Sequence, residues 1–389
     1  MNGKKVKYIA YYNDDKINPR ENRNTFLAIK NKVDYICRAL NRNGYEVEIV
    51  SPCWSNNDTG YYKGRISRIN EGVLLRNFFT IGSKGKTMKK IKQILSSIFL
   101  LKYLLFGIKK EDIVIVYHSI SLIWPITIAK YIKKFDIILE VEEIYSDVWK
   151  GSANYEQEVK YIKKFEKYLF ASDKLSVLFA EKPSVVIYGA YEAINVEKKE
   201  NNFNDEINLV YAGSIDRVKG GAFNAIKSMR YLPNRYHLNI LGFGEKTHID
   251  EMIDLIEKLN LEMNRECCSF HGILVGDEYK KFMLNCDIGL NPQVQGEYMN
   301  SAFPSKVLSY LSHHLNVVST AIESITISKV ANQINFSADD TPSSIAKAVM
   351  TVELDKAHSQ LSVIETLDYE FVKDLNSLLK SSNLEASNY

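Results

Sequence analysis

The chain has 389 residues, a length that suits two domains of roughly 150 to 200 residues each. Hydrophobic residues make up 46% and charged residues 25%, the composition of an ordinary soluble globular protein. The formal net charge of +3 conceals an asymmetry, because residues 1–200 carry +11 and the remainder −8. This asymmetry suggests one face that meets an anionic partner. None of the usual modules that read nucleic acid is present, so we expect no nucleic-acid partner.

Three features favour a cytoplasmic location. The five cysteines show no metal-ligand or disulfide spacing, which fits a reducing compartment. The first residues, MNGKKVKYIAYYND, lead directly into a strand and lack the apolar core of a signal peptide. No uninterrupted apolar stretch approaches the ~20 residues that cross a bilayer.

Strand-like apolar runs alternate with helical patterns throughout the first half, which predicts a parallel, doubly wound α/β sheet over residues 1–196. The predicted strands are Val6–Tyr11, Tyr45–Val50, Val73–Phe79, Ile113–Tyr117, Ile137–Val141 and Leu175–Leu178. The predicted helices are Phe26–Asn43, Met88–Phe106, Leu122–Phe135 and Tyr155–Ala171.

The second of these helices lies in a basic segment. Eight lysines and no acidic residue occur between Ser83 and Lys110, and apolar residues recur there at helical spacing. Such a helix can lie in a bilayer interface with its lysines near anionic headgroups. We expect Lys89, Lys90, Lys92 and Lys102 to meet the anionic inner surface of the cell membrane. The alternative is a helix whose apolar face packs on the core while its outer face is solvated.

The segment Leu139–Asp147 (LEVEEIYSD) ends a buried strand with a cluster of carboxylates. Alternation places Glu140 and Glu142 on one side of the strand and Glu143 on the other. A carboxylate whose pKa is raised can serve as a general base. We expect Glu142 or Glu143 to be this catalytic base; the alternative is that both are solvated and paired with nearby lysines. His118, at the end of strand Ile113–Tyr117, is expected to be a polar cap.

The polar segment 197–206 has no periodicity and is predicted to be a linker. A second alternating pattern follows over 207–355. Its predicted strands are Leu209–Tyr211, Tyr236–Leu241, Ser269–His271, Ile288–Leu290 and Val317–Ser319. Residues 356–389 contain the amphipathic stretch TLDYEFVKDLNSLLKS, which predicts a terminal helix.

Glycines and cations gather in the loop after the first of these strands. Gly213 is followed by Arg217, Lys219 and a Gly-Gly pair, and glycines with fixed positive charge at a helix N-terminus suit a diphosphate. A second glycine turn, Gly242-Phe-Gly244, follows the next strand, where open α/β sheets bind ligands. The alternatives are a solvated lysine in a turn and simple strand-to-helix geometry. His271 is expected to be a packed core residue.

The segment FPSK contains Ser305 and Lys306 and leads into a helical stretch. A lysine at a helix start can face an anionic ligand, whereas the alternative is that Pro304 starts a helix at its favoured first turn and Lys306 is surface charge.

In their order and spacing, these segments resemble the donor half of GT-B glycosyltransferases, specifically the group 1, family-4-like enzymes of bacterial capsule, exopolysaccharide or O-antigen assembly. The resemblance implies two Rossmann-like doubly wound domains facing across a cleft, with the terminal helix packing back across the junction. It implies transfer of a sugar from a nucleotide-diphosphate donor, most commonly a uridine diphosphate (UDP) sugar, to a hydroxyl of a lipid-linked saccharide. This would occur peripherally at the cytoplasmic face of the membrane, without a metal and without another cofactor.

The resemblance also implies residue roles. Lys219, Gly213, Arg217, Gly242 and Gly244 would hold the diphosphate, and the backbone near Ile273 would meet the base. Ser305 and Lys306 would face the donor, with Glu297 or Tyr298 near the sugar. The segment before Asp147 would face the cleft, so that Glu142 or Glu143 activates the acceptor.

The chain also departs from the family pattern. Where family-4 enzymes carry two glutamates separated by seven intervening residues, this chain has Ser301 and Ser309. This leaves retention or inversion of configuration open. It also supports an alternative function, a non-catalytic GT-B subunit that binds acceptor or activates a partner transferase. A second alternative on the same fold is a nucleotide-sugar epimerase or phosphorylase.

Overall fold

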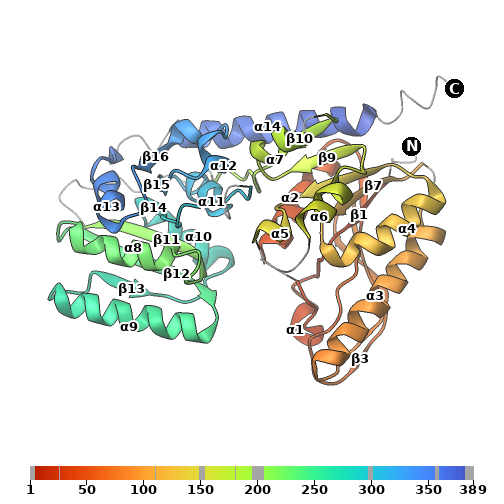
Figure 1. Cartoon of the computed structure of the whole chain (residues 1–389), viewed down its shortest axis with the longest axis horizontal. Helices are drawn as coiled ribbons and strands as arrows, with labels where there is room; N and C mark the ends of the chain where they lie inside the picture. The colour runs from red at the N-terminus through yellow and green to blue at the C-terminus, as the bar shows by residue number, and fades with distance from the viewer. Residues whose placement is uncertain are drawn as a thin grey trace. The chain divides into compact units, whose positions relative to one another are not determined.

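A computed structural model describes residues 5–25, 27–109, 111–148, 154–179, 181–194, 206–296, 301–354 and 359–381. The chain divides into two compact units (Figure 1). The first comprises Met1–Ala190 with Tyr369–Tyr389, and the second comprises Tyr191–Asp368. The predicted linker 197–206 lies outside the described residues except for Glu206. No helix in the described ranges has the length and apolar character needed to cross a membrane.

The first unit is built on a sheet of eight described strands in the order β10-β9-β8-β7-β1-β2-β5-β4. All neighbouring pairs are parallel except β4 with β5. Strands β2, β5 and β4 lie on one side of β1, and β7 to β10 lie on the other, so the strand order reverses between β1 and β7. The strands are β1 Lys5–Ile9, β2 Glu46–Ser51, β4 Arg65–Asn70, β5 Val73–Asn77, β7 Ile113–Tyr117, β8 Ile137–Val141, β9 Lys167–Phe170 and β10 Ser184–Val186, beside a two-stranded ribbon of β3 Tyr61–Tyr62 and β6 Thr80–Ile81.

Helices pack on this sheet, and its strands β8 and β9 are buried on both faces. They are α1 Asn18–Glu21, α2 Leu27–Arg42, α3 Lys86–Phe106, α4 Ile123–Lys133, α5 Tyr145–Val148, α6 Tyr155–Ile162 and α7 Asp173–Leu178, with a 3₁₀ turn at Ile120–Leu122. A core cluster joins the inner faces of α3 and α4 to β7 and β8, and Leu100, Leu104 and Ile126 are fully buried in it.

The last helix, α14 Ser359–Lys380, contributes its second half to the first unit. The ring of Phe371 lies 5.6 Å from that of Tyr35, and the Asn43 amide donates to the Val372 carbonyl at 2.9 Å. The buried Lys167 ammonium donates to the Leu378 carbonyl at 3.0 Å. The terminal helix therefore completes the first unit through apolar and polar contacts.

The predictions for 155–178 were wrong. The expected helix Tyr155–Ala171 ends at Ile162, and Lys167–Phe170 is the buried strand β9, paired in parallel with β8. The expected strand Leu175–Leu178 is part of α7, which begins where the Ser172 hydroxyl accepts the Leu175 N–H at 3.3 Å. A short apolar run has no period of its own, so burial between neighbours decided its conformation.

The second unit is a sheet of six described strands, all parallel, in the order β13-β12-β11-β14-β15-β16. This is the doubly wound 3-2-1-4-5-6 order, with its switch point between β11 and β14. The strands are β11 Ile207–Ile215, β12 Tyr236–Gly244, β13 Cys268–Phe270, β14 Ile288–Asn291, β15 Asn316–Thr320 and β16 Ile334–Ser337. The helices are α8 Gly221–Ser228, α9 Lys246–Glu262, α10 Gly276–Leu284, α11 Lys306–Ser312, α12 Glu323–Thr326 and α13 Pro342–Met350, with 3₁₀ turns at Met229–Tyr231 and Ala331–Gln333.

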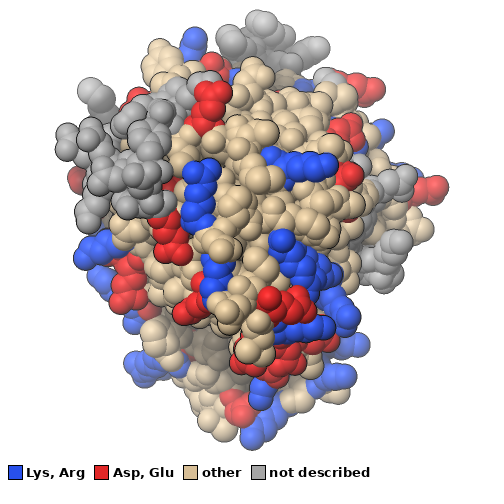
Figure 2. Space-filling model, turned by 90° about the vertical axis from the view of Figure 1, so that its left-hand side faces the viewer, with Lys and Arg blue, Asp and Glu red and all other residues tan. Residues whose placement is uncertain are grey.

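Charges are mixed on the face of the molecule that Figure 2 presents. Lysine and arginine side chains lie among aspartates and glutamates there, and no single sign covers that face. The charge asymmetry of the sequence therefore does not show as one uniform patch on this face.

Candidate functional site

The strongest site lies in the second unit at its switch point, beside the segments that follow β11 and β14. Open α/β sheets bind ligands at the carboxyl ends of their strands in this position. The Val294 N–H donates to the Lys219 carbonyl at 3.2 Å, and the Asn224 amide donates to the Pro292 carbonyl at 3.2 Å. These bonds hold the segment after β14 against the loop after β11 and against α8, and they place Lys219 at the edge where α11 begins with Lys306.

Lys306 is half-buried against an aromatic ring. Its Nζ lies 4.0 Å from the ring centroid of Tyr211, which is itself buried in β11. A Cβ atom built on Gly213 would lie 2.9 Å from this Nζ. Glycine at position 213 therefore leaves the space that the Lys306 side chain occupies, and the Tyr211 ring gives the ammonium a favourable cation–π contact.

Two cations meet here, and the described residues supply no counter-charge to either. Burial, together with the nearby Lys219 charge, lowers the pKa of Lys306 from its ordinary value to about 7. In the described ranges no carboxylate pairs with either lysine. Two positive charges that lie close together and partly away from water raise the free energy of the folded protein unless a bound anion neutralises them. The pair is therefore suited to a ligand with two or more negative charges, such as a diphosphate.

The start of α8 adds amide groups to the same edge. Its N-cap Gly220 has φ +66°, a left-handed conformation that favours glycine, and no side chain caps the helix. The Asp216 carboxylate accepts the N–H groups of Val218 at 2.8 Å and Lys219 at 2.9 Å, which shapes the turn. The first-turn amides of α8 have no partner within the helix and can bind an anion.

The other predicted diphosphate residues are placed differently. The exposed Arg217 guanidinium is ion-paired with Glu251 at 3.1 Å, and Lys219 is the neighbouring charge that acts on Lys306. A Cβ on Gly242 would lie 1.9 Å from the Gly213 carbonyl oxygen, and one on Gly244 2.2 Å from that of Ile215. These two glycines thus let β11 and β12 remain paired to their ends. The expected turn at Gly242-Phe-Gly244 is therefore the last part of strand β12, and glycine is needed there for close strand pairing.

The structure corrects the expectation for His271. Its ring is exposed at the end of β13, bonded to the Asn239 side chain at 2.9 Å and 4.7 Å from the ring of Phe282, so it is not a core residue. Ile273 follows with 61% of its surface exposed. Ser305 is exposed at the N-cap of α11, whereas Glu297 and Tyr298 lie outside the described residues.

Sequence reasoning missed Tyr211 and Tyr310 at this site. The Tyr310 hydroxyl accepts the Ala212 N–H at 2.8 Å and donates to the Leu290 carbonyl at 3.2 Å, so it joins β11 to β14 beneath the lysines. Tyr211 supplies the ring under Lys306. The available signal in the sequence was an aromatic residue, Tyr211, two positions before Gly213 near the end of β11.

In the first unit, the predicted base residues adjoin a buried acid. Glu142 is ion-paired with Lys32 of α2, and Glu143 is half-buried beside it. The fully buried Glu140 accepts the Tyr8 hydroxyl, and burial with the nearby Glu142 charge raises the pKa of Glu140 to about 8. The carboxylate with the raised pKa is thus Glu140, which the sequence analysis did not select.

His118 is a buried structural group. Its Nε2 lies 2.8 Å from the Glu158 carboxylate, which also accepts the N–H groups of Tyr145 at 2.8 Å and Ser146 at 2.9 Å. The arrangement joins the end of β7 to α5 and α6, as expected of a polar cap.

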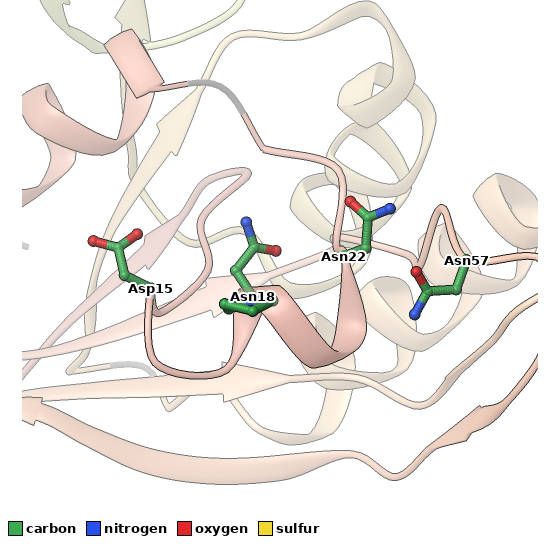
Figure 3. Close-up of a pocket in the computed structure, with 5 residues that line it drawn as sticks. Asp15, Asn18, Asn22 and Asn57 are labelled. Carbon is green, nitrogen blue, oxygen red and sulfur yellow. The ribbon is translucent and has the colours of Figure 1, made fainter. Parts of the chain in front are cut away.

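A polar pocket of about 410 Å³ opens at the loops that follow β1 and β2 (Figure 3). It is lined by Asp15, Asn18, Pro19, Asn22 and Asn57, and none of these residues is basic. Amide and carboxylate groups in this number can donate to and accept from the hydroxyls of a saccharide.

The basic helix α3 differs from its prediction in one lysine. Lys89, Lys90 and Lys102 are exposed, but Lys92 is buried and donates to the carbonyls of Ser55 at 2.7 Å and Ser83 at 3.3 Å. Lys92 anchors the helix to a loop because its side chain points inward, so the prediction that it meets a membrane was wrong. Throughout the described ranges, no group of three or more His, Cys, Asp or Glu side chains is placed to hold a metal ion.

Solved structures share this architecture over the whole chain. The E. coli trehalose-6-phosphate synthase bound with UDP-2-fluoro glucose matches with a TM-score of 0.68 at 10% identity, covering 99% of each chain. The trehalose 6-phosphate synthase of Burkholderia multivorans matches with a TM-score of 0.67 at 11% identity, covering 99% of this chain and 98% of that one. Anabaena HepE in complex with UDP and glucose matches with a TM-score of 0.59 at 12% identity, covering 99% and 100%.

No protein-family model matches the chain, and no curated protein does. Identities of this size establish the fold and not the substrate. The predicted fold class is confirmed: the chain has the GT-B fold of two Rossmann-like domains that glycosyltransferases of the trehalose-phosphate synthase type also adopt.

Proposed function

We propose that this protein is a glycosyltransferase that moves a sugar from a nucleoside-diphosphate donor to a hydroxyl of a lipid-linked saccharide in bacterial surface polysaccharide assembly. The observation that carries the donor half is the Lys306–Lys219 pair at the switch point of the second unit, without a described counter-charge. In the reaction, the bond from the anomeric carbon to the diphosphate breaks and a bond to the acceptor oxygen forms. The acceptor proton passes to a base.

The two lysines and the first-turn amides of α8 would stabilise the negative charge that develops on the departing diphosphate. Preorganised cations and dipoles in a partly desolvated site are suited to this task. Solved proteins of the same fold hold UDP or a UDP-sugar analogue, which supports a nucleotide-sugar donor and makes UDP the first nucleotide to test.

The acceptor half of the proposal rests on the first unit. The described residues that line its polar pocket include a carboxylate and amides but no basic residue, so a neutral saccharide fits it better than a sugar phosphate. Glu142 or Glu143 remains the proposed base, and the Lys32 partner of Glu142 would have to release it for that role. The exposed lysines of α3 support an acceptor carried by a lipid at the inner face of the membrane.

Calorimetric titration with UDP, and with guanosine diphosphate beside it, tests the donor half. We expect micromolar binding of one nucleotide by the wild type and at least about a tenfold loss in Lys219→Ala, as for removal of one charged partner. Lys258→Ala, which removes an exposed lysine of α9 in the same unit, is the matched control and should bind like the wild type.

Absence of binding for both nucleotides would favour the second candidate, a non-catalytic subunit of the same fold. That candidate is kept because Ser301 and Ser309 stand where family-4 enzymes carry glutamates. If nucleotide binds, conversion of one nucleotide-sugar into another without an acceptor substrate would instead favour the epimerase.

A further inference from the structure

Between Ile91 and Ile98, helix α3 turns polar side chains toward the protein and apolar side chains toward solvent, whereas farther along Leu100 and Leu104 are buried in the core. Ile91, Ile94, Leu95 and Ile98 are each between 39% and 55% exposed. The residues turned inward include Lys92, Ser96 and Ser97, each at most 5% exposed. A surface helix of a soluble domain normally shows the opposite orientation. Since Lys92 is bonded to two carbonyls and Ser96 to the Pro52 carbonyl, the orientation is held by specific contacts.

The adjacent helix α4 also exposes apolar side chains, although its buried residues Pro125, Ile126 and Ala129 are apolar as well. Trp124, Ile128, Tyr131 and Ile132 are exposed at spacings i, i+4, i+7 and i+8, which places them on one helical face. The two helices pack against each other, as Figure 1 shows. Tryptophan and tyrosine have an apolar ring and a polar tip, and they are enriched where lipid meets water.

Cations accompany the apolar face. Lys86, Lys89, Lys90 and Lys102 are exposed, and in the part of α3 that the structure describes none of them is paired with a carboxylate. No acidic residue occurs in the sequence between Ser83 and Lys110. Apolar side chains beside uncompensated lysines complement an anionic lipid surface in both hydrophobicity and charge.

We propose that the outer faces of α3 and α4 form a membrane-docking surface that inserts Ile91, Ile94, Leu95 and Ile98 into the headgroup boundary of an anionic bilayer. A second copy of the chain fits less well. A two-fold contact would bring the same lysines of both copies together without acids between them. The proposal deepens the proposed function by naming the surface at which a lipid-linked acceptor would be met. Its test does not depend on catalysis.

The test is co-sedimentation of the full chain with phosphatidylcholine vesicles, with and without phosphatidylglycerol. We expect binding that requires phosphatidylglycerol and weakens with salt, accompanied by a blue shift of tryptophan emission that Trp124→Phe reduces. The double variant Ile94→Gln/Ile98→Gln should lose roughly tenfold or more in vesicle affinity. Lys89→Gln/Lys90→Gln should lose affinity for phosphatidylglycerol vesicles and most of the salt dependence. Leu261→Gln, a control at an 82% exposed leucine of α9, should bind like the wild type.

UDP titration of the same variants separates the two proposals. Vesicle binding without nucleotide binding would leave this surface standing and remove the proposed donor site. Wild type that fails to sediment, or a double variant that sediments as strongly as wild type, would overturn the docking surface. A wild-type dimer that Ile94→Gln/Ile98→Gln converts to monomer would also overturn it, in favour of contact between copies.

Discussion

At the scale of single residues, Lys306 is the most informative position. It is a cation kept partly away from water, over the Tyr211 ring and near a second lysine, without a described carboxylate to pair with it. Such an arrangement costs stability in the ligand-free protein, and sites of this kind are typically retained for binding. The sequence predicted Lys306 at the start of a helix. Its neighbours come from elsewhere in the chain, Tyr211 from β11 and Lys219 from the loop that follows β11.

Replacement of Lys306 should therefore separate stability from function. We expect Lys306→Met to bind UDP at least about a hundredfold more weakly, because a charged contact to phosphate is lost. The same change should raise the free energy of unfolding by roughly 1 kcal/mol, since an unpaired, half-buried charge is removed. Urea denaturation and calorimetry measure the two quantities. A variant that is less stable than wild type and still binds UDP would contradict this assignment.

Nucleotide affinity should depend on pH through the same group. The pKa of Lys306 is about 7 in the free protein, and a bound diphosphate would raise it. Below pH 7 the lysine is already protonated, so its contribution to affinity is complete there. As pH rises from about 7 to about 9, binding must take up a proton and affinity falls, by at most about tenfold per pH unit.

Calorimetry in two buffers of different ionisation enthalpy measures this proton uptake directly. The phosphates of UDP are fully ionised over most of this range, so their own titration contributes little. Constant affinity without proton uptake would mean that Lys306 does not contact the nucleotide.

At the scale of elements, most strands and helices of the alternating pattern were predictable. Strands Ile113–Tyr117 and Ile137–Val141 have the predicted bounds, and α2 and α3 differ from prediction by at most two residues at either end. Long amphipathic helices and buried apolar strands can be predicted from the spacing of their apolar residues. The short elements between 155 and 178 were misassigned, since four to eight residues carry too little periodicity and a serine cap decides where α7 begins.

The cap of α7 gives a prediction at this scale. Ser172 is fully buried and accepts the Leu175 N–H, so Ser172→Ala should lower the free energy of unfolding of the first unit by about 1 kcal/mol. Urea denaturation followed by hydrogen exchange of first-unit peptides measures the change. Thr341→Ala removes the cap of α13 and should affect the second unit instead. Equal effects of both variants on both units would show that the units do not unfold separately.

At the scale of the whole molecule, α14 belongs to both compact units. The division of the chain falls between Asp368 and Tyr369, within this helix. In its second half Phe371, Leu375 and Leu379 are buried, and near its end the Leu378 carbonyl accepts a hydrogen bond from the Lys167 ammonium. The first unit is therefore not built from a continuous stretch of chain.

Ending the chain at Asp368 should destabilise the first unit by on the order of 5 kcal/mol, because several apolar side chains and two acceptors of the Lys167 ammonium are lost. Hydrogen exchange should rise in β9 and α2 and change less in the second-unit sheet. A chain ending at Ser381, which keeps all of these contacts, is the control and should match the wild type. Uniform protection in both truncated chains would show that the helix contributes nothing to the first unit.

The sequence by itself determined the alternating α/β pattern, the Gly-rich loop with Lys219, the helix start at Lys306 and the amphipathic helices α3 and α14. These features depend on the period of apolar residues and on local turn chemistry, which neighbours along the chain encode. The tertiary structure decided which cations meet, since Lys306, Lys219 and Tyr211 lie close only after β11 and β14 have paired. It also decided that the apolar stripe of α3 is split, with Leu100 and Leu104 inside and four residues outside, because burial depends on what the rest of the fold packs against a helix.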